Sequence, residues 1–277
     1  MKSFTDKVAA ITGAGSGIGR ALALALAKRH CHLALSDVNE TGLKETAKQA
    51  QAFGVKVTTA KVDVSDREAV HAWADQVVKD HGKCNMIFNN AGVAHSASVE
   101  GTDYQDFEWI MGINFWGVVH GTKAFLPHLK ASGEGHVINV SSLFGLISIP
   151  AQSTYNASKF AVRGYTEALR QELELSGAPV SATSVHPGGI RTNIARDARV
   201  HDSMTSLGVK DLERSRRSFE KMLSMPPEKA ADIILKAVQK NERRVLVGND
   251  ARLLDLVQRL LPTTYQRLVT TFSRRVM

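Results

Sequence analysis

Short apolar runs alternate with longer amphipathic stretches along the chain. Runs rich in β-branched residues predict strands at 8–12, 32–36, 56–62, 86–89, 136–140, 180–185 and 244–247. Between them, apolar positions recur at helical spacing near residues 18–29, 40–53, 67–81, 104–131, 154–176 and 227–240. This alternation predicts an α/β fold with a doubly wound parallel sheet of about seven strands, covered by helices on both faces.

The length of 277 residues fits a single large α/β domain, which we expect to occupy residues 1–250. Residues 193–224 form a polar, basic insertion, which we expect to act as a lid on the substrate side. Residues 251–277 form an amphipathic extension, either packed on the protein or lying on a membrane surface. No run of 18 apolar residues occurs, so no transmembrane helix is expected.

The net charge of +8 is spread along the chain without interleaved aromatic residues, which argues against nucleic-acid binding. Cys31 and Cys84 lie in apolar runs and have neither a CxxC partner nor a histidine pair nearby. We therefore expect buried free thiols, no metal site and a reducing, cytoplasmic location.

A glycine-rich sequence, TGAGSGIG at residues 12–19, follows the first strand and opens a helix. Glycines permit a tight turn and close approach of a pyrophosphate, and the helix N-terminus offers free N–H groups. Asp37 ends the second strand, where a carboxylate can bind ribose hydroxyls and repel a 2′-phosphate. We therefore favour NAD over NADP, although Asp37 could also be a simple turn residue. The expected phosphate-side contacts are Gly13, Gly15, Ser16, Gly17, Ile18 and Gly19.

Tyr155 and Lys159 lie four positions apart on a predicted helix, so the phenol and the ammonium share one face. A nearby cation is expected to lower the pKa of the tyrosine and fit it for proton transfer with an alcohol or ketone. Upstream, a buried strand ends in Ser141 and Ser142 at the same predicted sheet edge. Either hydroxyl could donate a hydrogen bond to the substrate oxygen.

Taken together, these motifs closely resemble the short-chain dehydrogenase/reductase family, over residues 5–192 and more loosely 225–249. The resemblance implies a Rossmann-type fold, and its spacing favours Ser142 over Ser141. It implies that Ser142 polarises the substrate oxygen, Tyr155 is the general acid/base, and Lys159 holds the nicotinamide ribose. Asn114 would hold a relay water. Further implied cofactor contacts are Asp63, Val64, Asn90, Ala91, Gly92, Tyr155, Lys159, Pro187, Gly188, Ile190 and Thr192.

The resemblance also implies a homodimer or homotetramer, assembled through the long helices near 104–131 and 154–176. The apolar segments near the serines favour a hydrophobic alcohol or ketone. The expected substrate-side residues are Val93, His95, Leu143, Phe144 and Ile149. For His95, a surface position is favoured over substrate contact.

Two other functions remain open. One is an NADPH-dependent reductase of 3-oxoacyl thioesters, whose anionic substrate could meet arginines of the 193–224 insertion, although interleaved acidic residues favour solvated arginines there. The other is a non-catalytic nucleotide-binding scaffold. The presence of Ser142, Tyr155, Lys159 and Asn114 together argues against it, because a scaffold does not need all four.

Overall fold

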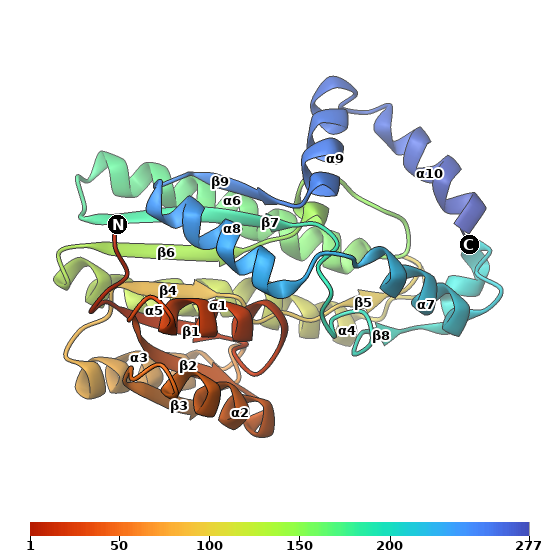
Figure 1. Cartoon of the computed structure of the whole chain (residues 1–277). Helices are drawn as coiled ribbons and strands as arrows, with labels where there is room; N and C mark the ends of the chain where they lie inside the picture. The colour runs from red at the N-terminus through yellow and green to blue at the C-terminus, as the bar shows by residue number, and fades with distance from the viewer. Residues whose placement is uncertain (277) are drawn as a thin grey trace.

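The computed structural model describes residues 1–276, and its centre is a parallel sheet of seven strands in the order β3-β2-β1-β4-β6-β7-β9 (Figure 1). The predicted doubly wound α/β fold is therefore confirmed. Each strand lies within two residues of its predicted ends. The strands are β1 (Val8–Thr12), β2 (His32–Asp37), β3 (Val57–Lys61), β4 (Met86–Asn89), β6 (Gly135–Val140), β7 (Val180–Pro187) and β9 (Arg244–Val247).

Helices cover both faces of this sheet. One apolar core joins the sheet to α1 (Gly17–Ala27), α2 (Glu40–Gln51) and α8 (Pro227–Gln239). The other joins it to α3 (Arg67–His81), α5 (Gly117–Ala131) and α6 (Ser153–Leu175). Central strands such as β1 and β6 are buried on both sides because each face meets a helical layer, which explains the nearly continuous apolar sequence of β1.

The long helix predicted near 104–131 is divided. It consists of α4 (Tyr104–Met111), a π-helical turn η1 (Gly112–Trp116) and α5. A π turn is uncommon and often occurs at functional sites. Here it contains Asn114, one of the predicted catalytic residues.

The insertion at 193–224 contains elements that the sequence pattern did not predict. These are β8 (Arg199–Val200), η3 (Asp202–Leu207) and α7 (Leu212–Met222). β8 pairs in parallel with β5 (His95–Ser96), forming a small second sheet. Two-residue strands leave no periodic signal in a sequence, so only the long-range pairing reveals them.

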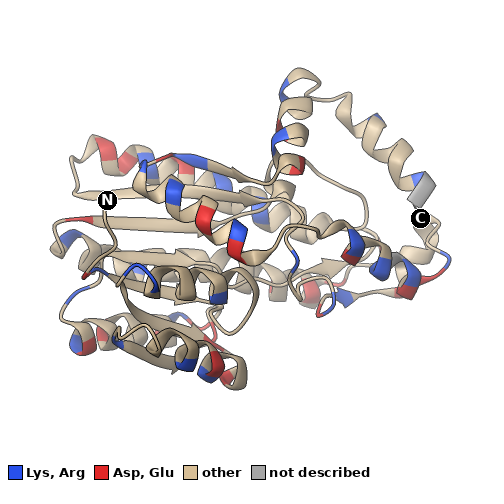
Figure 2. Ribbon diagram, in the orientation of Figure 1, with Lys and Arg blue, Asp and Glu red and all other residues tan. Residues whose placement is uncertain are grey.

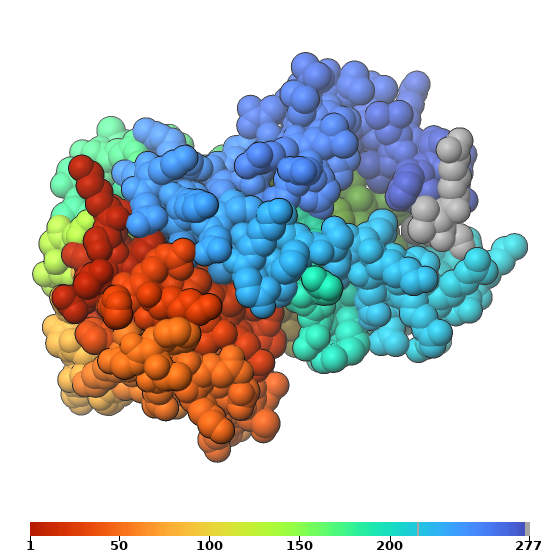
Figure 3. Space-filling model, viewed as in Figure 1, coloured from red at the N-terminus to blue at the C-terminus, as the bar shows by residue number. Residues whose placement is uncertain are grey.

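The C-terminal extension forms α9 (Asn249–Leu260) and α10 (Tyr265–Val276), which project from the sheet edge beside β9 (Figure 1). Their inner faces pack on the short helix η2 (Leu143–Gly145) and the loop after it. Figure 3 shows this extension, in dark blue, overhanging the surface above the insertion, in lighter blue. Within residues 1–276, no helix is both long and apolar enough to cross a bilayer.

Candidate functional site

The predicted motifs converge at the carboxyl ends of the central strands. The strand order reverses between β1 and β4, and ligands of open parallel sheets bind in the crevice at such a point. The glycine turn follows β1, the Asn-Asn-Ala-Gly turn follows β4 and the serine pair follows β6. The sheet therefore brings three distant sequence motifs to one edge.

Backbone geometry explains the glycines of the turn. Gly13 has φ +66°, and a Cβ atom on it would lie 2.8 Å from the Cα of Ala91. Gly17 has φ +51°, and its added Cβ would lie 3.0 Å from the methyl carbon of Thr192. Both positions have a left-handed conformation, which glycine accommodates without strain. The close neighbour is backbone at Gly13 and the Thr192 side chain at Gly17. The result is a narrow cradle at the start of α1.

Asp37 lies directly against this cradle. Its carboxylate accepts hydrogen bonds from the backbone N–H groups of Gly15 and Asn39, both at 2.8 Å. Arg20 contacts the same turn, and its guanidinium donates to Thr46 Oγ1 at 2.9 Å and to the carbonyl of Gly15. The Asp37 carboxylate is therefore fixed at the end of β2, and the Arg20 guanidinium is occupied by hydrogen bonds within the protein.

Tyr155 and Lys159 are both buried on the first turns of α6, at 8% and 3% exposure. The Lys159 ammonium donates to the Val140 carbonyl at 3.2 Å and lies 5.6 Å from the centre of the Tyr155 ring. Burial disfavours the charged forms, so it lowers the pKa of Lys159 to about 8. It also raises the pKa of Tyr155, and the neighbouring Ser142 hydroxyl opposes this shift.

The expected lowering of the tyrosine pKa by lysine is therefore not what the protein groups alone produce. Desolvation has the larger effect on a phenol that is almost completely enclosed.

The two serines have different surroundings. Ser141 donates its hydroxyl to the Lys159 carbonyl at 2.8 Å, so it fixes α6 against the end of β6. The Ser142 hydroxyl accepts from the Phe144 N–H at 3.1 Å and lies beside Tyr155. This arrangement leaves the Ser142 hydroxyl hydrogen free to donate, which favours Ser142 over its neighbour.

A buried histidine lies beneath Ser142. The Nδ1 atom of His186 is 2.9 Å from the Ser142 carbonyl oxygen, and Nε2 is 2.9 Å from Ser184 Oγ. A carbonyl can only accept, so Nδ1 carries the proton and Nε2 accepts from the serine hydroxyl. Burial lowers the pKa of His186 to about 4, which keeps the ring neutral. The sequence analysis missed this link between the ends of β6 and β7.

Asn114 lies in the π turn and is completely buried. Its side chain accepts from the Val93 N–H at 2.8 Å and donates to the Val93 carbonyl at 3.0 Å and to Ser158 Oγ at 3.1 Å. An added Cβ on Gly92 would lie 3.2 Å from Asn114 and 3.3 Å from the Lys159 ammonium. Asn114 is therefore a neighbour of Lys159 and holds the segment after the Asn-Asn-Ala-Gly turn.

The remaining predicted cofactor residues lie around the same edge. Asn90 binds the glycine turn through its amide, which donates to the carbonyls of Thr12 and Gly13. Asp63 is exposed and accepts from Ser65 in its own turn, whereas its neighbour Val64 is buried.

Residues 187–192 form an arch from the end of β7 toward the glycine turn. At its far end, the Thr192 side chain lies next to Gly17. Within this segment, the Ile190 side chain is buried. The Gly189 N–H donates to Asp250 at 2.6 Å, and a Cβ at position 188 would lie 2.2 Å from the same carboxylate, so a side chain there would displace Asp250. Asp250, which the sequence analysis did not single out, thus connects the arch to α9.

The predicted substrate-side residues are partly enclosed. Phe144 meets the Tyr155 ring edge to face, with ring centres 6.3 Å apart. Leu143 and Ile149 pack with the C-terminal extension, and the Tyr265 hydroxyl accepts from the Ser148 N–H at 3.2 Å. The apolar wall near Tyr155 is therefore shared between the loop after β6 and the two last helices.

The surface position favoured for His95 is wrong, because this side chain is 1% exposed. The pairing of β5 with β8 covers it. Its ring nitrogens lie 3.1 Å from Thr154 Oγ1 and 3.4 Å from Asp106. Asp106 also pairs at 2.6 Å with Arg199, so this cluster fastens the insertion to α4 and α6.

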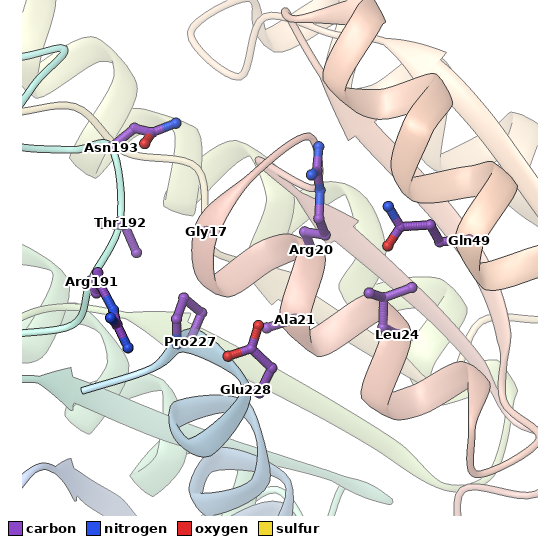
Figure 4. Close-up of a pocket in the computed structure, with 10 residues that line it drawn as sticks. All are labelled: Gly17, Arg20, Ala21, Leu24, Gln49, Arg191, Thr192, Asn193, Pro227 and Glu228. Carbon is purple, nitrogen blue, oxygen red and sulfur yellow. The ribbon is translucent and has the colours of Figure 1, made fainter. Parts of the chain in front are cut away.

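Cavities lie on either side of the site at the carboxyl ends of the central strands. One of about 330 Å³ lies behind the glycine turn, between α1, residues 191–193 and the start of α8 (Figure 4). Arg20 and Arg191 are among its lining residues. Another, of about 480 Å³, lies between Val99, the loop 148–151 and the exposed side of α6 near Phe160. Neither includes Tyr155 or Ser142. The first is lined by the predicted cofactor residues Gly17 and Thr192, and the second by the predicted substrate-side residue Ile149.

The model of the short chain dehydrogenase family matches residues 7–203. The chain belongs to this family. SadH of Mycobacterium tuberculosis, described as an oxidoreductase, is 51% identical over 97% of this chain and 96% of its own length. Human estradiol 17-beta-dehydrogenase 11 is 30% identical over 99% of this chain and 85% of its own.

A solved structure shows the same family relationship in three dimensions. A short chain dehydrogenase/reductase from Burkholderia phymatum, in complex with NAD, aligns with a TM-score of 0.86 and 30% identity. The alignment covers 94% of this chain and 95% of that one. The chain is thus an oxidoreductase with a Rossmann-type fold, as the sequence motifs predicted.

Proposed function

We propose that the chain interconverts a hydrophobic secondary alcohol with its ketone, or an alcohol with its aldehyde, using NAD(H). The observation that carries this proposal is the placement of Ser142, Tyr155 and Lys159 at the sheet edge beside the glycine cradle. Together they offer a hydrogen-bond donor, a proton donor and a cation at one place.

The residues present fit a nicotinamide dinucleotide. The glycine turn leaves a cradle that a Cβ would fill. The Ser16 side chain does not cap α1, so the first N–H groups of this helix are available to an anion. Gly13, Gly15, Gly17 and Gly19 would hold the pyrophosphate, Asp37 the adenosine ribose, and Lys159 the nicotinamide ribose. When bound, this cofactor supplies or accepts the hydride.

The chain's own residues would handle the proton and the substrate oxygen. Ser142 would donate a hydrogen bond to that oxygen as negative charge develops on it. Tyr155 would give its phenolic proton to the oxygen during reduction, or take it back during oxidation. Lys159, held by Val140, would stabilise the phenolate by its charge, and Asn114 would hold a relay water.

We propose NAD(H) over NADP(H) because the Asp37 carboxylate is fixed beside the cradle and would repel a 2′-phosphate. Asp37→Asn keeps a hydrogen-bond acceptor for Gly15 but removes the charge. The ratio of kcat/KM for NADH over NADPH should fall at least about tenfold. Initial rates with both cofactors measure this ratio.

Glu40→Gln is the matched control, because Glu40 is an exposed carboxylate nearby that pairs with Lys61 at 3.0 Å. Its cofactor ratio should remain that of the parent chain. An unchanged ratio in Asp37→Asn, or preference for NADPH in the parent, contradicts the assignment.

The proposed substrate class rests on the apolar wall of Leu143, Phe144 and Ile149, which packs with the C-terminal helices. In a series of secondary alcohols of increasing chain length, kcat/KM should rise about fourfold for each added methylene until the wall is covered. NADH absorbance measures each rate. A flat series would argue against an apolar cleft.

The rival reduction of acyl thioesters predicts a preference for NADPH and for anionic substrates. The insertion's arginines do not favour it, since Arg196 pairs with Asp197, Arg199 with Asp106, and Arg217 with Glu213. A non-catalytic scaffold would show no turnover with any alcohol or ketone in the panel.

We further propose a homodimer or homotetramer and a cytoplasmic location. Exposed aromatic side chains on the long helices, Phe107, Trp116 and Phe160, support the assembly. Cys31 and Cys84 are buried free thiols, which supports a reducing compartment. Residues 251–277 would provide peripheral contact with a membrane.

A further inference from the structure

The C-terminal helices have apolar residues on two sides. The inner side, with Leu254, Val257 and Tyr265, packs on the loop after β6. The outer side of α9 exposes Leu253, Leu256 and Leu260, which recur at helical spacing. The outer side of α10 repeats this pattern with two further exposed residues, Leu268 and Phe272.

This exposure is high for large apolar side chains. Leu260 is 71% exposed, Leu253 61% and Phe272 58%. Single exposed leucines are ordinary on a protein surface. Five large apolar side chains exposed on two consecutive helices instead indicate a surface that binds a partner. The exposed aromatics proposed for the subunit contact lie elsewhere, on α4, α6 and the π turn.

Charge distinguishes the kind of partner. Residues 256–277 contain no Asp or Glu, whereas Arg259, Arg267 and Arg274 lie among the apolar residues. Asp255, the last carboxylate, is buried and pairs with Arg259 at 2.8 Å and Arg244 at 3.7 Å. Figure 2 accordingly shows basic but no acidic positions along α10. The exposed surface is therefore apolar and cationic.

We propose that the outer faces of α9 and α10 dock on an anionic lipid bilayer. The exposed leucines and Phe272 enter the boundary between headgroups and acyl chains, and the arginines contact lipid phosphates. This proposal extends the proposed function, because the inner faces of the same helices form the apolar wall beside Tyr155. Docking would hold that wall against the phase in which a hydrophobic alcohol accumulates.

Sedimentation with vesicles tests the apolar part of the contact. The full chain should bind vesicles of phosphatidylcholine containing about 30% phosphatidylglycerol, and Leu260→Ser should weaken this binding about tenfold. Leu175→Ser is the matched control, since Leu175 is 89% exposed at the end of α6. The control should bind vesicles like the parent chain.

The charge of the vesicle tests the second part. Arg267→Gln should weaken binding to the anionic vesicles about fivefold and leave binding to pure phosphatidylcholine unchanged. Lys130→Gln, at an exposed lysine of α5, should change neither. The thermal unfolding midpoint of each variant checks that it folds.

Two results would overturn the proposal. One is equal, weak binding of parent and Leu260→Ser to both kinds of vesicle. The other is a fall in molar mass by light scattering in Leu260→Ser, which would assign the surface to a second copy of the chain. Oxidation of a water-soluble alcohol without vesicles reports the proposed function separately, so either idea can fail while the other stands.

Discussion

Tyr155→Phe should lower kcat by about 100- to 10,000-fold while leaving NAD binding largely intact. The substitution removes one oxygen and retains the ring that packs against Phe144. Ser142 and Lys159 would still polarise the substrate oxygen, but no group at that position could exchange its proton. Steady-state rates give the loss, and quenching of intrinsic fluorescence by NADH gives the binding constant.

Tyr165→Phe provides the matched control on the same helix. Tyr165 is partly buried, and its ring packs edge to face with Phe115 at 6.2 Å between centres. It lies away from the glycine cradle, so turnover should not change. Full turnover in Tyr155→Phe would contradict the catalytic assignment, and equal losses in both variants would indicate a general packing effect.

The sheet was predictable because its strands are buried on both faces. A strand such as β1, with every residue buried, needs a nearly continuous apolar sequence, and this run stands out before an amphipathic helix. The glycine turn and the Tyr155–Lys159 pair were predictable for a related reason. Their residues are close in sequence, so local geometry already places them together.

Contacts between distant segments were not predictable in this way. The burial of His95 depends on β8, about a hundred residues further along, and two-residue strands carry no periodic signal. His186 and Asp250 act on Ser142 and Gly189 through single hydrogen bonds across the fold. Nothing in the spacing of these residues indicates such pairs.

The fold also explains why the last two helices matter to the predicted centre. Asp250 ties α9 to the arch at 187–192, and Tyr265 ties α10 to the loop after β6. Both of these segments border the position proposed for the nicotinamide and the substrate. A pattern of leucines predicted an amphipathic extension, but only the three-dimensional structure shows which side of it faces the loop.

Acid should destabilise the folded chain because two histidines are buried as neutral rings. Burial lowers the pKa of His136 to about 3 and that of His186 to about 4, against 6.5 for an exposed ring. Between pH 6.5 and about 4.5 the unfolded chain binds protons at these residues and the folded chain does not. Stability therefore falls as the pH falls, by up to about 2.7 kcal/mol per pH unit for two protons.

Urea unfolding at several pH values in this window measures the slope. His136 contacts Thr183 Oγ1 at 2.8 Å inside the sheet, and His136→Gln should reduce the slope by up to about 1.4 kcal/mol per pH unit because one proton is no longer taken up on unfolding. His71→Gln, at an exposed histidine of α3, should leave the slope unchanged. His81 and His95, whose pKa values burial also lowers, add to the slope in the same direction. A parent chain whose free energy of unfolding is flat across this window would show that the two rings are not buried in their neutral forms.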